Sequence, residues 1–229
     1  MDMLALVLHV QILGLLHPQR ALVDGVEAVP GHRYGGERFV VEVGSLKRAY
    51  PGALLVQDGG SELRLINEVD VEDYVASVVG AELDTGPAAA REALAIVARS
   101  YGIWSEGRGH LCDTTHCQWY RGLEKADIPA ARRTRGEVLL LHGRVPPVFH
   151  SQDCGGHTKK ARDVWPTASA DAQAASFRSL DSHDPKGPKK GRGHGVGLCQ
   201  RGALFLASKG ASAHQILARY FPGLFLGRR

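Results

Sequence analysis

Two amphipathic helices in succession, separated by a Gly-Pro break, most constrain the fold of this chain. Asp70 suits a helix N-cap, and apolar residues follow it at helical spacing: Val71, Tyr74, Val75, Val78 and Val79. Gly86 and Pro87 end this helix and begin a second one. The buried face of the second helix is predicted from Leu94, Val97, Ala98 and Tyr101. The pattern therefore predicts a pair of packed helices.

The residues before this pair have the pattern of β-strands. Short apolar runs alternate with Pro-Gly, Gly-Gly and Asp-Gly turn signals, at 4–10, 21–23, 39–43, 54–56 and 63–66. We therefore expect an α+β protein. In it, a β-rich N-terminal portion, residues 1–65, packs with a helical core, residues 66–229.

The second half of the chain is predicted to be mixed. A basic stretch at 126–135 favours a short helix, and the segments 138–141 and 145–150 favour a hairpin. The polar stretch 166–193 is predicted to be a long loop. Two helices are expected near the C-terminus, one at about 198–208 and one capped by Ser212 and Gln215.

Composition excludes several classes of protein. A hydrophobic content of 44% and a charged content of 23% are ordinary for a globular protein, and the net charge of +4 is mild. We expect no nucleic-acid partner. No run of 18 apolar residues occurs, so no transmembrane segment is predicted. The opening MDMLALVLHVQILGLL lacks a basic start and a small-residue cleavage site, and is interpreted as a buried strand rather than an export signal.

Glu82 is the candidate acid catalyst. It follows Val78 by one turn and so falls on the apolar stripe of the first helix. Loss of solvation and the negative end of the helix dipole both favour the neutral form, so we expect a raised pKa. A carboxylic acid that is protonated near neutral pH is suited to general acid catalysis on a glycosidic bond. The alternative is a glutamate in a frayed last turn that points to solvent.

A Cys/His cluster follows the second helix. Four ligand-type residues occur within eight positions: His110, Cys112, His116 and Cys117. Such a set can bind zinc tetrahedrally, with Cys154 or His150 as a further ligand. The alternatives are a disulfide between the two cysteines of the cluster, or buried thiols with hydrogen-bonded histidines.

Two later segments have the composition of walls of a site. In HSQDCGGHT, Ser151 and Cys154 stand beside histidines, but no orienting acid is evident for covalent catalysis. GRGHGVGLCQRGA fits neither the Walker spacing nor the dinucleotide fingerprint. We expect its glycines to let the backbone approach a substrate and to place His194 and Gln200 in a groove.

Taken together, these segments resemble the SpoIID family, which includes the sporulation stage II protein D and the LytB amidase enhancers. The most specific motifs are CDTTHCQ and GHGVGLCQ. The resemblance covers roughly residues 60–223 in the family's order and rests on NEVDVEDYVASVVGAEL, EALAIVARSY, CDTTHCQWYRG, TRGEVLLLHGRVPPVFHSQDCGGHT, GHGVGLCQRGA and ILARYFPG. The family's long insertion before GHGVG is reduced here to about 166–192.

The resemblance implies an enzyme, a peptidoglycan lytic transglycosylase that acts on glycan strands, preferably those stripped of stem peptides. The family's catalytic acid falls on Glu82. It would protonate the glycosidic oxygen between MurNAc and GlcNAc, and the MurNAc 6-hydroxyl would attack C1 to leave a 1,6-anhydro end. A hydrolase would more often need a second carboxylate, for which Asp113 and Asp153 are the candidates.

The same resemblance implies further roles. Residues expected to line the substrate groove are Arg99, Tyr101, Gln118, Tyr120, His150, His194 and Gln200. Some SpoIID proteins carry zinc at the Cys/His cluster, so a structural zinc ion is the expected cofactor. The expected partners are peptidoglycan strands and a cell-wall amidase, and the expected location is extracytoplasmic. Two other functions stay open: a non-catalytic, glycan-binding enhancer of the amidase, and a zinc-dependent hydrolase.

Overall fold

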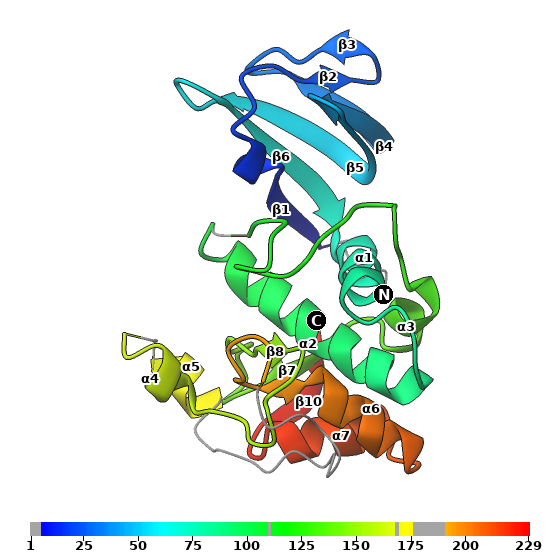
Figure 1. Ribbon diagram of the computed structural model, residues 1–229, viewed down its shortest axis with the longest axis vertical. Helices are drawn as coiled ribbons and strands as arrows, with labels where there is room; N and C mark the ends of the chain where they lie inside the picture. Colours follow the sequence, from blue (N-terminus) through cyan, green and yellow to red (C-terminus); the bar gives the residue numbers. More distant parts are fainter. Residues whose placement is uncertain (1–5, 110, 168–169, 176–190) are drawn as a thin grey trace.

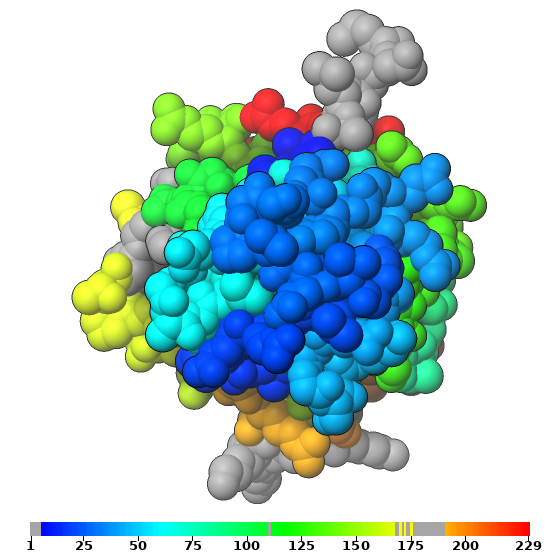
Figure 2. Space-filling model, turned by 90° about the horizontal axis from the view of Figure 1, so that it is seen from above, coloured from blue at the N-terminus to red at the C-terminus, as the bar shows by residue number. Residues whose placement is uncertain are grey.

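In the part of the chain that the structure describes, a six-stranded antiparallel sheet occupies one end of the molecule and the helices gather at the other (Figure 1). This computed structural model describes residues 6–109, 111–167, 170–175 and 191–229. The sheet contains, in spatial order, β1 (Val7–Ile12), β6 (Leu63–Asp70), β5 (Leu46–Asp58), β4 (Arg33–Val43), β2 (Leu22–Val23) and β3 (Val26–Glu27). Seen from the sheet end, these strands form the blue and cyan centre of the face (Figure 2).

The observed sheet confirms the predicted α+β class and the β-rich N-terminal portion. In β1, Leu8 and Val10 are buried, while His9 between them faces outward and contacts Glu106. This alternation is the period of a strand that is buried on one face. The predicted boundary at residue 65 falls inside β6.

Two helices, α1 (Val71–Glu82) and α2 (Ala88–Glu106), follow the sheet as predicted. The Asp70 side chain caps α1 by accepting a hydrogen bond from the backbone N–H of Glu72 at 2.8 Å. The apolar residues predicted to face the core are buried in both helices. In Figure 1, α2 runs across the middle of the molecule, with α1 beside it and α6 and α7 below it.

The remaining elements surround α2. They are α3 (Ile128–Arg133), β7 (Glu137–Leu140), β8 (His150–Ser151), α4 (Ala161–Val164), α5 (Ala170–Ala175), β9 (Leu198–Cys199), α6 (Gln200–Ser208), α7 (Ala213–Tyr220) and β10 (Phe225–Arg228). The predicted capping box of the last helix is present, because Ser212 and Gln215 exchange side-chain and backbone hydrogen bonds.

The predicted hairpin between 138–141 and 145–150 is limited to its turn, where Leu141 and Arg144 form one antiparallel bridge. β7 pairs with the C-terminal strand β10, and β8 pairs in parallel with β9. Pro146 and Pro147 lack the backbone N–H groups that a ladder with β7 would need. The predicted loop 166–193 is also partly wrong, because α5 lies within it; its residues 168–169 and 176–190 lie outside the described residues.

A single apolar core joins the sheet to the helices. It includes residues of β1, β6, α1, α2 and α7, among them Leu8, Val69, Val78, Ile96 and Ile216. Within the described residues, no helix is both long enough and apolar enough to cross a lipid bilayer.

Arg99 lies inside this core, so the expectation that it lines a substrate groove is wrong. Its guanidinium group is fully buried and donates to both carboxylate oxygens of Glu72, at 3.0 and 2.6 Å. It also donates to the backbone carbonyl of Glu137 at 3.0 Å. A buried arginine is tolerated where a carboxylate and carbonyls satisfy its donors. Arg99 therefore fixes α2 to α1 and to β7.

Arg99→Ala should lower the free energy of unfolding by about 3–5 kcal/mol, because it leaves the carboxylate of Glu72 without its buried partner. Arg99→Lys should lower the free energy of unfolding by less, because it keeps the charge although it loses the two parallel hydrogen bonds. Urea denaturation measures both. Arg162→Ala, at a largely exposed side chain, is the control and should change stability by at most about 0.5 kcal/mol. An Arg99→Ala loss no larger than the control's would contradict the structural role.

Candidate active site

A cavity of about 430 Å³ lies where α1 ends, and we call it the Glu82 cavity. Its walls come from segments that are far apart in the sequence: the end of α1, the loop 115–119, the segment 149–152 with β8, and the segment 192–194 with Gln200, together with Tyr101 of α2 and Trp165. The motifs that the sequence predicted to form one site are therefore brought together.

Glu82 is the last residue of α1, and its side chain faces this cavity with 15% of its surface exposed. Its Oε1 accepts a hydrogen bond from the backbone N–H of Trp119 at 3.1 Å. Its Oε2 accepts one from Nε2 of Gln200, also at 3.1 Å. His150 Nε2 lies 3.5 Å from Oε1. The alternative of a frayed, solvent-exposed glutamate does not hold.

The pKa of Glu82 is lowered, against the prediction. Burial raises the pKa of Glu82. The hydrogen bond and the charge of His150, with the hydrogen bonds from Trp119 and Gln200, outweigh burial and lower this pKa to about 2. The prediction considered only burial and the helix dipole, and these three donors come from distant segments. In the free protein Glu82 is therefore a carboxylate at neutral pH.

His194 forms part of an aromatic wall of the cavity. Its ring lies 4.8 Å from the ring of Trp165 and 6.2 Å from that of Phe149, between centroids. Burial and the charge of His150 lower the pKa of His194 to about 4, so it is neutral at pH 7. Its Nδ1 accepts the backbone N–H of Val196 at 3.0 Å, so the proton of the neutral ring is on Nε2.

Most of the residues predicted to line the groove do so. The cavity is lined by Tyr101, Gln118, His150, His194 and Gln200, in addition to Glu82. Nε2 of Gln118 is buried and has no hydrogen-bond partner within the described residues. Trp119 and Trp165 also line the cavity and were not predicted. Trp119 lies in the CDTTHCQWYRG motif, whereas Trp165 directly precedes the stretch 166–193 that was predicted to be a loop.

Tyr120 lies in the core, so its predicted place in the groove is wrong. Its side chain is fully buried, and its hydroxyl donates to Oδ1 of Asn67 at 2.7 Å. Its ring packs against Tyr74 at 5.3 Å and against Tyr50 at 5.9 Å, between centroids. Tyr120 therefore attaches the loop after α2 to the sheet.

Glu82 is the single carboxylate among the described residues that line the cavity. Asp113 is buried, and its Oδ2 accepts a hydrogen bond from the backbone N–H of Leu13 at 2.9 Å. Asp153 is also buried and accepts the backbone N–H of Gly155 at 2.8 Å. The two acids predicted as partners for Glu82 in hydrolysis therefore face elsewhere.

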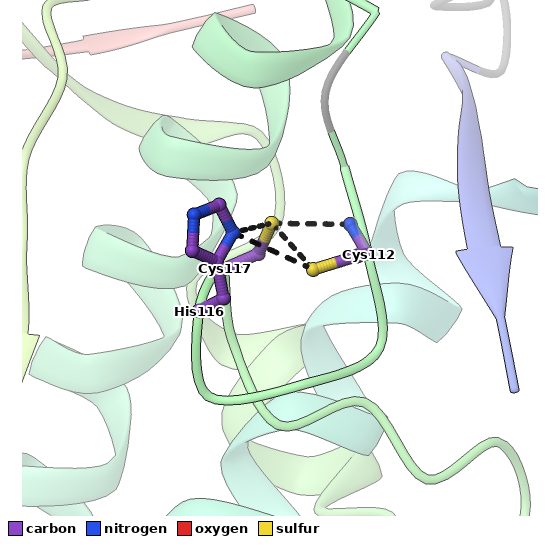
Figure 3. Close-up of side chains that lie close together, drawn as sticks. All are labelled: Cys112, His116 and Cys117. Carbon is purple, nitrogen blue, oxygen red and sulfur yellow. Dashed lines mark hydrogen bonds between the residues drawn. The ribbon is translucent and has the colours of Figure 1, made fainter. Parts of the chain in front are cut away.

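Three members of the Cys/His cluster point toward one another (Figure 3). Two of them, His116 and Cys117, also line the Glu82 cavity. The sulfurs of Cys112 and Cys117 lie 2.9 Å apart, and Nδ1 of His116 lies 3.9 and 3.7 Å from them. The fourth member, His110, lies outside the described residues. Cys154, proposed as an additional ligand, belongs to a different group of side chains, and His150 lies beside Glu82.

Two sulfurs and an imidazole nitrogen are a donor set that suits zinc. Bonds of about 2.3 Å to sulfur and 2.0 Å to nitrogen at tetrahedral angles separate the ligand atoms by roughly 3.5–3.8 Å. The nitrogen–sulfur distances are close to this range, and the sulfurs would have to separate by about 1 Å. The hydrogen bond shared with Cys117 lowers the pKa of Cys112 to about 4, which favours the thiolate form that a metal binds.

Comparison with known proteins relates part of this chain to one family. Residues 59–141 match the family model of the stage II sporulation protein SpoIID. The resemblance to the SpoIID family is confirmed. This SpoIID segment contains Glu82 and the Cys/His cluster, whereas His150, His194 and Gln200 follow it. An uncharacterized protein of Brachyspira hyodysenteriae is 26% identical over 262 aligned positions, which cover 76% of this chain and 71% of that protein. The SpoIID match supports a role at the cell wall.

The buried, neutral His194 should make stability depend on pH. Because its pKa in the folded protein, about 4, is below the unfolded value of about 6.5, its contribution is complete above pH 6.5 and is lost as the pH falls toward 4. As the pH falls from 6.5 to 4, we expect the free energy of unfolding of wild type to decrease by about 1–3 kcal/mol more than that of His194→Asn, which keeps an acceptor near Nδ1. Urea denaturation across this range measures the difference. His32→Asn, at an exposed position, should follow wild type; equal slopes for wild type and His194→Asn would contradict the assignment.

Proposed function

We propose that the protein is a lytic transglycosylase that cleaves the MurNAc–GlcNAc bond of peptidoglycan, with Glu82 as general acid and then as general base. The observation that carries the proposal is the position of Glu82: it is a single carboxylate, largely buried, in a cavity built by the SpoIID segment and the two glycine-rich motifs that follow it. An extracytoplasmic location follows from this substrate.

A single carboxylate favours a transglycosylase over a hydrolase. Glycoside hydrolases use two carboxylates, one as acid and one as nucleophile or as base for water. In transglycosylation the attacking group is the 6-hydroxyl of the same MurNAc residue. Glu82 would give its proton to the leaving GlcNAc oxygen and then take the proton of the 6-hydroxyl. It would therefore end the reaction protonated, and no second carboxylate is needed.

Glu82 needs a proton at the start of this reaction, and His150 is placed to supply it. Its Nε2 lies 3.5 Å from Oε1 of Glu82. A sugar that fills the cavity removes the remaining water from the carboxylate, and desolvation favours the neutral acid. We therefore assign to His150 the transfer of one proton to Glu82 as substrate enters. The neutral His194 beside it then carries no competing charge.

The shape of the site supports a polymeric substrate. Trp119 and Thr115 line both the Glu82 cavity and an adjoining hollow of about 510 Å³, whose other walls include Leu15 and Arg121. Trp119 is 42% exposed between the two spaces, and an exposed aromatic face suits the apolar face of a sugar ring. A glycan strand would therefore extend across Trp119 in both directions.

One observation favours a second function, that of a non-catalytic glycan-binding enhancer of a cell-wall amidase. The three donors on Glu82 keep it ionised in the free protein, and an ionised carboxylate accepts hydrogen bonds from sugar hydroxyls without protonating a glycosidic oxygen. Cleavage assays distinguish the two functions.

We further propose that Cys112, His116 and Cys117 bind a structural zinc ion. The ion would tie the loop that carries Trp119 into the conformation in which its N–H reaches Glu82. The donor set and the low pKa of Cys112 support this proposal.

Wild type should release 1,6-anhydro-ended fragments from peptide-stripped glycan, and more slowly from intact sacculi, as measured by mass spectrometry. Glu82→Gln should reduce this release by about 10²–10⁴-fold, because the amide cannot transfer the proton. Glu92→Gln, on α2 and outside the cavity, is the matched control and should cleave like wild type. Products with free reducing ends would indicate a hydrolase. Folded wild type that binds glycan, stimulates an amidase and cleaves nothing would establish the enhancer instead.

The purified protein should contain zinc in a ratio of about one per chain, and Cys112→Ser should lower this content. Chelation should lower the melting temperature while the product ends stay the same, because the metal holds the loop and takes no part in the proton transfer. Elemental analysis and thermal denaturation measure these effects. Loss of cleavage on chelation with unchanged stability would favour the zinc-dependent hydrolase.

A further inference from the structure

The second pair of cysteines lies behind the Glu82 cavity. β8 and β9 run parallel, with Ser151 opposite Cys199 in the register. Cys154 follows β8 by three residues. The Sγ atoms of Cys154 and Cys199 and a carboxylate oxygen of Asp153 lie within 4.8 Å of one another. These three side chains form a buried group that is separate from the Cys/His cluster.

The two cysteines are in direct contact. The backbone N–H of Cys154 donates to Sγ of Cys199 at 3.3 Å. A hydrogen bond with Cys154, together with burial, raises the pKa of the Cys199 thiol. Cys199 also caps α6, since its sulfur accepts the N–H of Gly202 at 3.4 Å. Strand pairing on one side and the helix cap on the other hold both backbones in place.

We propose that Cys154 and Cys199 form a disulfide bond in the oxidised protein. A disulfide requires the sulfurs at about 2.05 Å and the Cα atoms at about 4.4–6.8 Å. The β8–β9 ladder brings the two segments together, the Cys154 N–H contacts Sγ of Cys199, and the two sulfurs lie within 4.8 Å, so we expect rotation of the side chains to close the remaining gap.

A metal ion is a poorer occupant of the same group. Oδ1 of Asp153 accepts the N–H of Gly155 at 2.8 Å, and Oδ2 lies 3.8 Å from Nε of Arg201. The carboxylate of Asp153 thus caps a turn through one oxygen and lies beside the guanidinium group of Arg201 with the other. The two sulfurs are then the remaining ligand atoms of this group. Among the residues that the structure describes, the two sulfurs then suit a covalent bond better than a tetrahedral metal site.

The bond would form by thiol–disulfide exchange with a small-molecule disulfide. The thiolate of Cys154, the more exposed cysteine at 7%, attacks one sulfur of the small disulfide and releases one small thiol, which takes up a proton. The sulfur of Cys199 then attacks Cys154 in the mixed disulfide and releases the second small thiol. Two protein thiols are oxidised and one small disulfide is reduced to two thiols. An extracytoplasmic location supplies such oxidants.

The position of the bond matters for the site. His150 lies four residues before Cys154, and Gln200 follows Cys199 directly. These two side chains hold the carboxylate of Glu82. A link between Cys154 and Cys199 would therefore fix their separation and make the rear wall of the cavity rigid. The proposal does not depend on the chemistry of Glu82, so a protein that cleaves nothing would still contain the bond.

Peptide mapping tests the proposal on the full chain, refolded with oxidised glutathione, denatured, alkylated and digested with trypsin without reductant. Cleavage after Arg and Lys places Cys154 in 145–159 and Cys199 in 193–201, whereas Cys112 and Cys117 share 109–121. We expect a species joining 145–159 to 193–201 that separates on reduction. Alkylated Cys154 and Cys199 on unlinked peptides, or links of either one to Cys112 or Cys117, would overturn the proposal.

A second measurement separates a native bond from one formed in the unfolded chain. Reductant should lower the melting temperature of wild type by on the order of 5–10 °C, because the bond closes a long loop. The double variant Cys154→Ala/Cys199→Ala should melt at the same temperature with and without reductant. Cys112→Ala/Cys117→Ala is the control and should keep the reductant-dependent shift. If wild type contains the link but reductant leaves its melting temperature unchanged, the bond is not native and the proposal fails.

Discussion

The burial of α2 is the constraint on which the rest of the structure depends. Residues 93–98 of this helix have no exposed surface, so protein must cover every side of it. α1, α6, α7, β1 and β7 provide that cover, and they come from both ends of the chain. Because α6 and α1 must both pack on α2, Gln200 at the start of α6 and Glu82 at the end of α1 come within hydrogen-bond distance. The contact between Glu82 and Gln200 is thus a consequence of covering one helix.

Arg99 shows how this helix accommodates a charge in its interior. Its guanidinium group replaces water with the Glu72 carboxylate and backbone carbonyls. The pair therefore specifies how α1 and β7 dock on α2, in addition to any contribution to stability. The sequence carries no sign of this role, because an arginine on an apolar helix is equally compatible with a position beside a groove.

Local features of the sequence predicted the fold better than the site. Caps at Asp70 and Ser212 and apolar spacing predicted α1, α2 and α7, because these rules act within a few residues. The pairing of β7 with β10 joins segments at opposite ends of the second half of the chain, and a two-residue turn near 142–143 made a local hairpin look sufficient. Tyr120 lies between cavity residues in a motif, yet its side chain faces the sheet, which the motif alone does not encode.

The charge state of Glu82 depends on groups from segments that are distant in the sequence. The helical spacing in the sequence places Glu82 on the buried stripe of α1, but its pKa is set by a backbone N–H, an amide and an imidazole that other segments contribute. A backbone donor has no residue signature, so no motif could reveal it. In this arrangement the interactions that stabilise the carboxylate also place the imidazole of His150 beside it. On the proposed mechanism, a substrate that displaces water from the cavity would favour the neutral form of Glu82, which would couple binding to activation of the acid.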